Sequence, residues 1–178
     1  MSAATSQDGN IKALNRVEAD ELVVQLVSLL DGGQAHATFE QAVDKFPAEL
    51  RGTVPQHLPY SAWQLLEHMR IALNDILLFS ANYDGSYKSP KWPDGYWTEA
   101  AAPPSDAAWA NSIHQVHAGL LEFKKLLQSG QADIFAAFPW GDGQNLLREA
   151  LLIADHNAYH VGEMIVLRRL FGAWPAAK

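Results

Sequence analysis

Residues 145–172 read NLLREALLIADHNAYHVGEMIVLRRLFG, and their periodicity predicts one long helix over about residues 145–171, closed by Gly172. Two histidines, His156 and His160, stand four residues apart, so both imidazoles lie on one face of that helix. The same face carries large apolar residues: Leu152, Ile153, Met164, Leu167 and Phe171. Because an apolar stripe of this kind normally faces a core, the stretch predicts a helix that carries two imidazoles into the protein interior.

The rest of the chain predicts three more long helices and a short one, with no strand. The first covers about residues 11–30, with an apolar stripe at Leu14, Val17, Val24, Val27 and Leu30. A short helix covers residues 38–45. The second long helix starts at the capping box Ser61 to Gln64 and runs to about residue 81, and the third covers residues 106–128.

The second and third long helices are separated by residues 82–104, a segment dense in Pro, Gly and aromatic residues. When extended, roughly 23 residues reach about 75 Å, whereas a 20-residue helix is only about 30 Å long. The segment can therefore run the length of a helix and start the third helix parallel to the second. We predict an all-α fold: a four-helix bundle, up-down-down-up, with this long crossover loop, as a single domain over residues 1–178 with a loose N-terminus at 1–10.

Charge and composition narrow the classes of partner. Thirteen Lys and Arg against 20 Asp and Glu give a net charge of −7, and the basic residues form no cluster larger than a pair such as Arg168 and Arg169. Binding to phosphate backbones needs a positive face, so no nucleic-acid partner is expected. No apolar run approaches the ~20 residues that cross a bilayer, and no signal sequence is recognised, so we expect no membrane association and a cytoplasmic location.

The chain contains no cysteine, so a metal would have to be held by nitrogen and oxygen ligands. His156 and His160 can bind one metal ion, or they can be unrelated, with one hydrogen-bonded in the core and the other at its edge. The short HxxxH spacing alone favours the second interpretation, because it occurs by chance. A third histidine would change the balance, and His68 is the best candidate because its helix face is also apolar, at Leu65, Ala72, Ile76 and Phe79.

Two acids share the histidine faces. Glu163 follows His160 by three residues, and Asp75 follows His68 by seven. Each can accept a hydrogen bond from an imidazole, act as a base on metal-bound water, or supply an oxygen ligand. Each can equally be a helix acid that reaches solvent or pairs with an arginine.

Four stretches resemble one known family: SAWQLLEHMRIALNDILLFS around His68, PKWPDGYW, FPWGDGQNLLREALL, and ADHNAYHVGEMIVLRRLFGAW at the C-terminal end. Together they are similar, over nearly the whole chain, to the DinB-like (YfiT-type) superfamily of metal-dependent helical bundles. The resemblance implies that His68, His156 and His160 hold one divalent metal, most simply Ni or Zn, with Fe or Mn as alternatives. Relatives of this kind include thiol S-transferases that use bacillithiol or mycothiol, and a mycothiol-dependent maleylpyruvate isomerase.

We therefore expect a metal-dependent enzyme of the thiol-dependent S-transferase type, acting on a small-molecule substrate with a low-molecular-weight thiol. Two alternatives stay open: a metal-dependent hydrolase, and a non-enzymatic stress protein that binds a metal or small ligand. The aromatic residues Trp140 and Tyr159, with Trp92 and Trp97, are candidates for the pocket wall.

The face of residues 145–171 opposite the histidines is also apolar, at Leu147, Leu151, Ala154, Ala158, Val161 and Ile165. A helix that is apolar nearly all round is buried on both sides. The first helix or the short helix can cover this second face, or another subunit can. We predict a symmetric homodimer.

Overall fold

The computed structural model describes residues 16–130 and 133–175, and within these ranges the chain is helical with no β-strand. The all-α prediction is confirmed for this part of the chain. The predicted loose residues 1–10, and the first residues of the predicted helix 11–30, lie outside it. The helices are α1 (Arg16–Asp31), α2 (Phe39–Val43), α3 (Ala62–Ser80), α4 (Asp106–Gln128) and α5 (Leu146–Leu170), with short 3-10 turns η1 (Ala48–Leu50) and η2 (Asp94–Tyr96).

Side-chain caps determine where the helices begin. The Ser61 hydroxyl accepts from the Gln64 N–H at 3.2 Å, and the Gln64 side chain accepts from the Ser61 N–H at 3.0 Å, so the predicted capping box of α3 is confirmed. Asn145 caps α5 by accepting from the Arg148 N–H. The short helix ends at Val43, two residues before the predicted end, because the next residues leave helical geometry and Lys45 has a φ of 48°.

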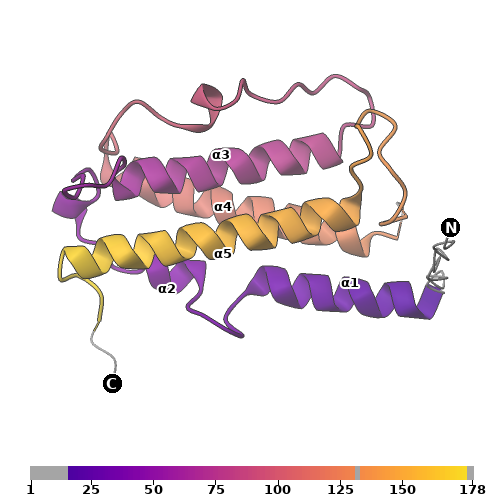
Figure 1. The fold of residues 1–178 in the computed structure, drawn as a ribbon, viewed down its shortest axis with the longest axis horizontal. Helices are drawn as coiled ribbons and strands as arrows, with labels where there is room; N and C mark the ends of the chain where they lie inside the picture. Colours follow the sequence, from indigo (N-terminus) through magenta and orange to yellow (C-terminus); the bar gives the residue numbers. More distant parts are fainter. Residues whose placement is uncertain (1–15, 131–132, 176–178) are drawn as a thin grey trace, which may run out of the picture.

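The four long helices lie lengthwise beside one another (Figure 1). α3 packs against α4 and α5, and α1 also packs against α4 and α5. The segment between α3 and α4 runs back along α3, with η2 in its course (Figure 1). Apolar side chains from α3, α4 and α5 fill the space between the helices, and the most deeply buried are Leu65, Leu66, Met69, Val116, Phe123, Leu146, Ile153, Met164 and Leu167.

The predicted apolar stripe of α1 is partly wrong. Val17 and Val24 are 70% and 58% exposed, whereas Leu26 and Leu30 are buried. α1 is rich in apolar residues, so more than one stripe fits helical spacing, and contacts with α4 and α5 decide which one is covered. No helix in the described ranges is long and apolar enough to cross a membrane.

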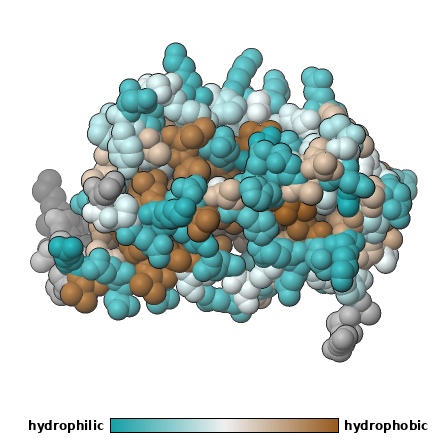
Figure 2. All heavy atoms as spheres, turned by 180° about the vertical axis from the view of Figure 1, so that it is seen from behind, coloured by the Kyte–Doolittle hydropathy of each residue, from teal (hydrophilic) through white to brown (hydrophobic). Residues whose placement is uncertain are grey.

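The second apolar face of α5 is covered in part by the chain itself. Both α1 and α2 pack against α5, and Val161 and Ile165 are buried, while Leu151 is 47% exposed. On the face seen from behind, hydrophobic residues form several groups with hydrophilic residues between them (Figure 2). Helices α1 and α2 therefore cover part of this face, and the homodimer stays a prediction.

Candidate metal centre

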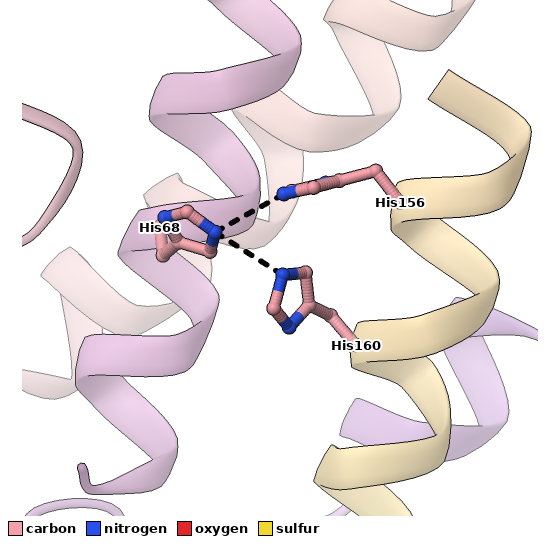
Figure 3. Close-up of side chains that lie close together, drawn as sticks. All are labelled: His68, His156 and His160. Carbon is pink, nitrogen blue, oxygen red and sulfur yellow. Dashed lines mark hydrogen bonds between the residues drawn. The ribbon is translucent and has the colours of Figure 1, made fainter. Parts of the chain in front are cut away.

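Three histidines from two facing helices meet at one point (Figure 3). His68 lies in α3, and His156 and His160 lie one turn apart in α5. The Nε2 atom of His68 lies 3.1 Å from Nε2 of His160 and 3.1 Å from Nε2 of His156. One nitrogen from each ring lies within 4.8 Å of the others, so the three histidines could hold a metal ion. Helical spacing alone does not bring His68 to the other two; the packing of α3 against α5 does.

The hydrogen bonds behind the rings determine which nitrogens carry protons. His68 Nδ1 lies 3.0 Å from the Tyr96 carbonyl oxygen, and His160 Nδ1 lies 2.7 Å from Oε2 of Glu163. A carbonyl and a carboxylate only accept, so each Nδ1 donates its proton outward. In a neutral ring this leaves Nε2 with a free lone pair, and two such lone pairs face each other across 3.1 Å. They repel each other unless a cation lies between them.

Protonation of His68 or His156 does not supply that cation at neutral pH. Burial lowers the pKa of His68, and repulsion from His160 adds to the effect. Burial, followed by repulsion from His160 and His68, lowers the pKa of His156 to about 4. At neutral pH both rings are therefore neutral, which is the state that binds metals. Two nitrogen ligands about 2.1 Å from a tetrahedral metal stand about 3.4 Å apart. The observed separations, together with neutral rings of His68 and His156, fit a divalent ion.

Glu163 lies behind the histidine cluster and orients it. Its Oε2 accepts from His160 Nδ1, and its Oε1 accepts from the Tyr60 hydroxyl at 2.6 Å. A carboxylate on the distal nitrogen of a metal-binding histidine holds the ring and increases its basicity. Burial, with the hydrogen bond to Glu163, raises the pKa of Tyr60, so this phenol keeps its proton. No sequence pattern had indicated Tyr60, which lies just before α3.

Asp75 has different partners, because both its oxygens bind the segment between α3 and α4. Oδ1 accepts from the Tyr87 hydroxyl at 2.9 Å, and Oδ2 accepts from the Tyr96 hydroxyl at 2.6 Å. Burial and this hydrogen bond raise the pKa of Tyr96 to about 12. Since the Tyr96 carbonyl also holds His68, Asp75 reaches the histidine cluster through Tyr96.

The aromatic part of the same segment covers His68. The Trp97 ring stacks on the His68 ring, with centroids 4.1 Å apart and planes within 4° of parallel. Its neighbour Tyr60 stacks on Trp97 at 5.5 Å. The run of aromatic residues in 82–104 was the sequence signal for Trp97, and spacing could not assign this ring to a histidine.

A cavity of about 670 Å³ lies against the three histidines. It is lined by residues of α3, α5 and the segment between α3 and α4, namely Tyr60, His68, Ala72, Asp75, Ile76, Trp92, Tyr96, Trp97, Leu152, Asp155, His156, Tyr159, His160 and Glu163. Of the four predicted pocket residues, Trp92, Trp97 and Tyr159 are among them and Trp140 is not. The Trp140 indole donates to the Phe79 carbonyl at 2.8 Å and stacks on Phe138, so it covers the C-terminal end of α3.

The predicted site residues thus fall into three groups. His68, His156 and His160 come together; Glu163 and Asp75 stand behind them with different partners; Tyr159 lines the cavity and Trp140 lies elsewhere. Comparison of the chain with protein-family models, with curated proteins and with solved structures found no match.

Proposed function

We propose that this chain is a metal-dependent enzyme with a DinB-like four-helix bundle, up-down-down-up, in which His68, His156 and His160 hold one divalent ion, Ni or Zn. One observation carries the proposal: the Nε2 lone pairs of His68 and His160 face each other. They do so because the Nδ1–H groups of these rings donate to the Tyr96 carbonyl and to Glu163. The mutual packing of α1, α3, α4 and α5, and the return of the segment between α3 and α4, support the bundle.

The proposed reaction is transfer of a group to an external thiol. When bound, a divalent ion supplies Lewis acidity that favours the deprotonated form of a thiol or water. The chain has no cysteine, so the thiol has to enter through the cavity beside the histidines. In the overall reaction the thiol loses its proton, sulfur bonds to the electrophilic carbon, and the leaving group departs with its electron pair and takes up a proton.

The residues around the cluster have separate tasks in this scheme. Glu163 and the Tyr96 carbonyl hold the rings of His160 and His68 with Nε2 inward. Trp97 stacks on His68, and Tyr60 stacks on Trp97, so the two rings exclude water from one side of His68. Both oxygens of Glu163 and of Asp75 accept hydrogen bonds within the protein, and these contacts hold the two carboxylates in place beside the cavity.

The metal site is tested with protein purified without an affinity tag. Wild type is expected to contain about one equivalent of Ni or Zn, and His160→Ala should bind at least about 100-fold more weakly, because a direct ligand matters more than its hydrogen-bond partner. His114→Ala, an exposed histidine of α4, is the matched control and should bind like wild type. A His160→Ala protein that keeps the wild-type metal content contradicts the site.

The reaction is tested separately by following loss of free thiol in mixtures of the metal-loaded protein, a thiol and an electrophile. Turnover that needs both the metal and the thiol supports transfer. Ester or amide cleavage without thiol would make the protein a hydrolase, and tight binding without turnover would make it a binding protein; either result overturns the proposed reaction.

A further inference from the structure

We infer that the cavity beside the histidine cluster selects its ligand by charge: it takes neutral or positively charged aromatic molecules and rejects molecules that carry carboxylate or phosphate groups. This inference deepens the proposed function, and rests on it for the identity of the cavity as a substrate site. The evidence is the composition of the cavity wall, so binding can be examined without a metal.

Five Tyr and Trp side chains form one part of the wall. Tyr60, Trp92, Tyr96, Trp97 and Tyr159 all line the cavity. Two of them are large and nevertheless exposed, since Trp92 is 70% and Tyr159 64% accessible. Trp92 is held with its edge against Tyr96, at 5.3 Å between centroids. Exposed indole and phenol faces beside a cavity bind flat apolar groups, and they also attract cations through the negative face of the ring.

The formal charge of the wall is negative. The lining contains the three acids Asp75, Asp155 and Glu163, and neither Lys nor Arg is among the described residues that line it. Tyrosines and His160 already hydrogen-bond Asp75 and Glu163. Asp155, in contrast, is exposed beside the cavity and meets solvent directly. A cationic group on a ligand can therefore form an ion pair with the Asp155 carboxylate.

An anionic group would find no Lys or Arg among the described residues of this wall. On entry it would lose its hydration without gaining a cation, and it would approach three carboxylates. A metal held by the histidines would add positive charge at the inner end of the cavity. The outer part of the ligand would still face Asp155 and the aromatic rings. The thiol or electrophile that fits is accordingly one without carboxylates at its outer end.

Arg169 is the cationic residue near the cavity with which an anionic ligand could pair. It lines a neighbouring cavity that shares Tyr60, Tyr159 and Glu163 with the first. A long anionic ligand that crossed this shared wall could pair with Arg169. Such a ligand would contradict the inference, and Arg169→Gln identifies it, because loss of this guanidinium would then weaken the anion and leave a neutral ligand unaffected.

The test uses metal-free wild-type protein and three probes of similar shape: benzylamine, benzyl alcohol and benzoate. Calorimetry and tryptophan fluorescence give the dissociation constants. Benzylamine and benzyl alcohol are expected to bind at least about tenfold more tightly than benzoate, because repulsion discriminates against the anion. Benzoate that binds as tightly as the other two, or that binds through Arg169, overturns the inference.

Two surface variants locate the effect without disturbing the core. Asp155→Asn should lower the preference for benzylamine over benzyl alcohol by about threefold, whereas Asp142→Asn, an exposed acid outside the cavity lining, should not. Trp92→Ala should weaken benzylamine and benzyl alcohol together. An unchanged preference in Asp155→Asn, or unchanged binding in Trp92→Ala, overturns the inference.

The outcomes for the two proposals are separable. If the protein binds no metal but keeps the order of the three probes, the proposed function fails and charge selection stands. If metal binds through the three histidines but benzoate is preferred, charge selection fails and the metal site stands.

Discussion

The two sides of the histidine cluster are built differently. On the α5 side, His156, His160 and the acceptor Glu163 all lie within two turns of one helix. On the α3 side, His68 stands alone, and the groups that hold it come from Tyr96 and Trp97, far along the chain. The α5 side is a local structure that helical spacing largely specifies. The α3 side forms only when the segment between α3 and α4 has folded back.

Glu163 and Asp75 show the consequence of this difference. Both are helix acids on a histidine face, and their spacing allows the same roles for each. Glu163 binds an imidazole directly, whereas Asp75 binds two phenols and acts on His68 through the Tyr96 backbone. Neither acid belongs to the group of side chains that could hold the metal. Because their hydrogen-bond partners differ, we expect Glu163 and Asp75 to respond differently to the same amide substitution.

The largest effect is expected on the α5 side, from Glu163→Gln. The amide keeps the shape but turns one acceptor into a donor, so it cannot accept from both His160 and Tyr60. We expect metal affinity to fall by about 10- to 100-fold, as for other carboxylates behind metal-binding histidines. Competition with a metal indicator at pH 7.5 gives the affinity.

Glu122→Gln is the control for this substitution, because Glu122 is an acid of α4 that pairs with Lys125 on the surface. It should bind metal like wild type. Equal affinities for Glu163→Gln and Glu122→Gln would show that the carboxylate behind His160 contributes nothing to the site.

A smaller effect is expected on the α3 side, from Asp75→Asn. The amide oxygen can accept from only one of Tyr87 and Tyr96, so the segment loosens while His68 keeps its backbone partner. Metal affinity should fall by less than about tenfold. Hydrogen exchange of residues 87–97 should rise clearly, because that segment loses an anchor.

The exposed acid Asp20 of α1 supplies the control, Asp20→Asn, which should change neither exchange nor affinity. A loss of affinity in Asp75→Asn as large as in Glu163→Gln would mean that Asp75 acts on the cluster directly and would remove the distinction between the two sides.

The pH dependence of stability tests the burial of His156. Its folded-state pKa is about 4, and its ordinary pKa is 6.5, so the unfolded chain binds more protons between these values. The free energy of unfolding of metal-free protein should therefore fall as the pH drops from 6.5 towards 4. Urea unfolding of His156→Gln should show a shallower dependence, while His114→Gln should match wild type. Identical slopes in all three proteins would place His156 in solvent.

The smallest effect is expected on the fold itself when the metal is removed. The core between α3, α4 and α5 is apolar and does not include the metal, so the helices should remain. Chelation should leave the helical circular dichroism at 25 °C unchanged and lower the melting temperature by several degrees, since a ligand of the folded state stabilises it by mass action. Loss of helical signal at 25 °C would make the metal a structural element of both sides.

Several sequence patterns that lie within a single helix predicted the structure correctly. The capping box of α3, the end of α5 at Gly172 and the shared face of His156 and His160 are all local, and the structure shows them. The predicted stripe of α1 was partly wrong, and Trp140 lies outside the predicted pocket. An apolar helix offers several faces, and an aromatic residue fits a helix end as well as a pocket, so neighbouring elements decide in both cases.

The helical fold and the shared face of two imidazoles follow from residue order alone, because backbone hydrogen bonding imposes a fixed period on side-chain direction. Packing between distant parts of the chain brings His68 into the cluster, places Glu163 and not Asp75 against a ring, and surrounds the cluster with Tyr60, Tyr96 and Trp97. These contacts join residues distant along the chain. Their partners depend on how α3 packs on α5 and where the segment between α3 and α4 comes to lie, and no short-range period encodes either.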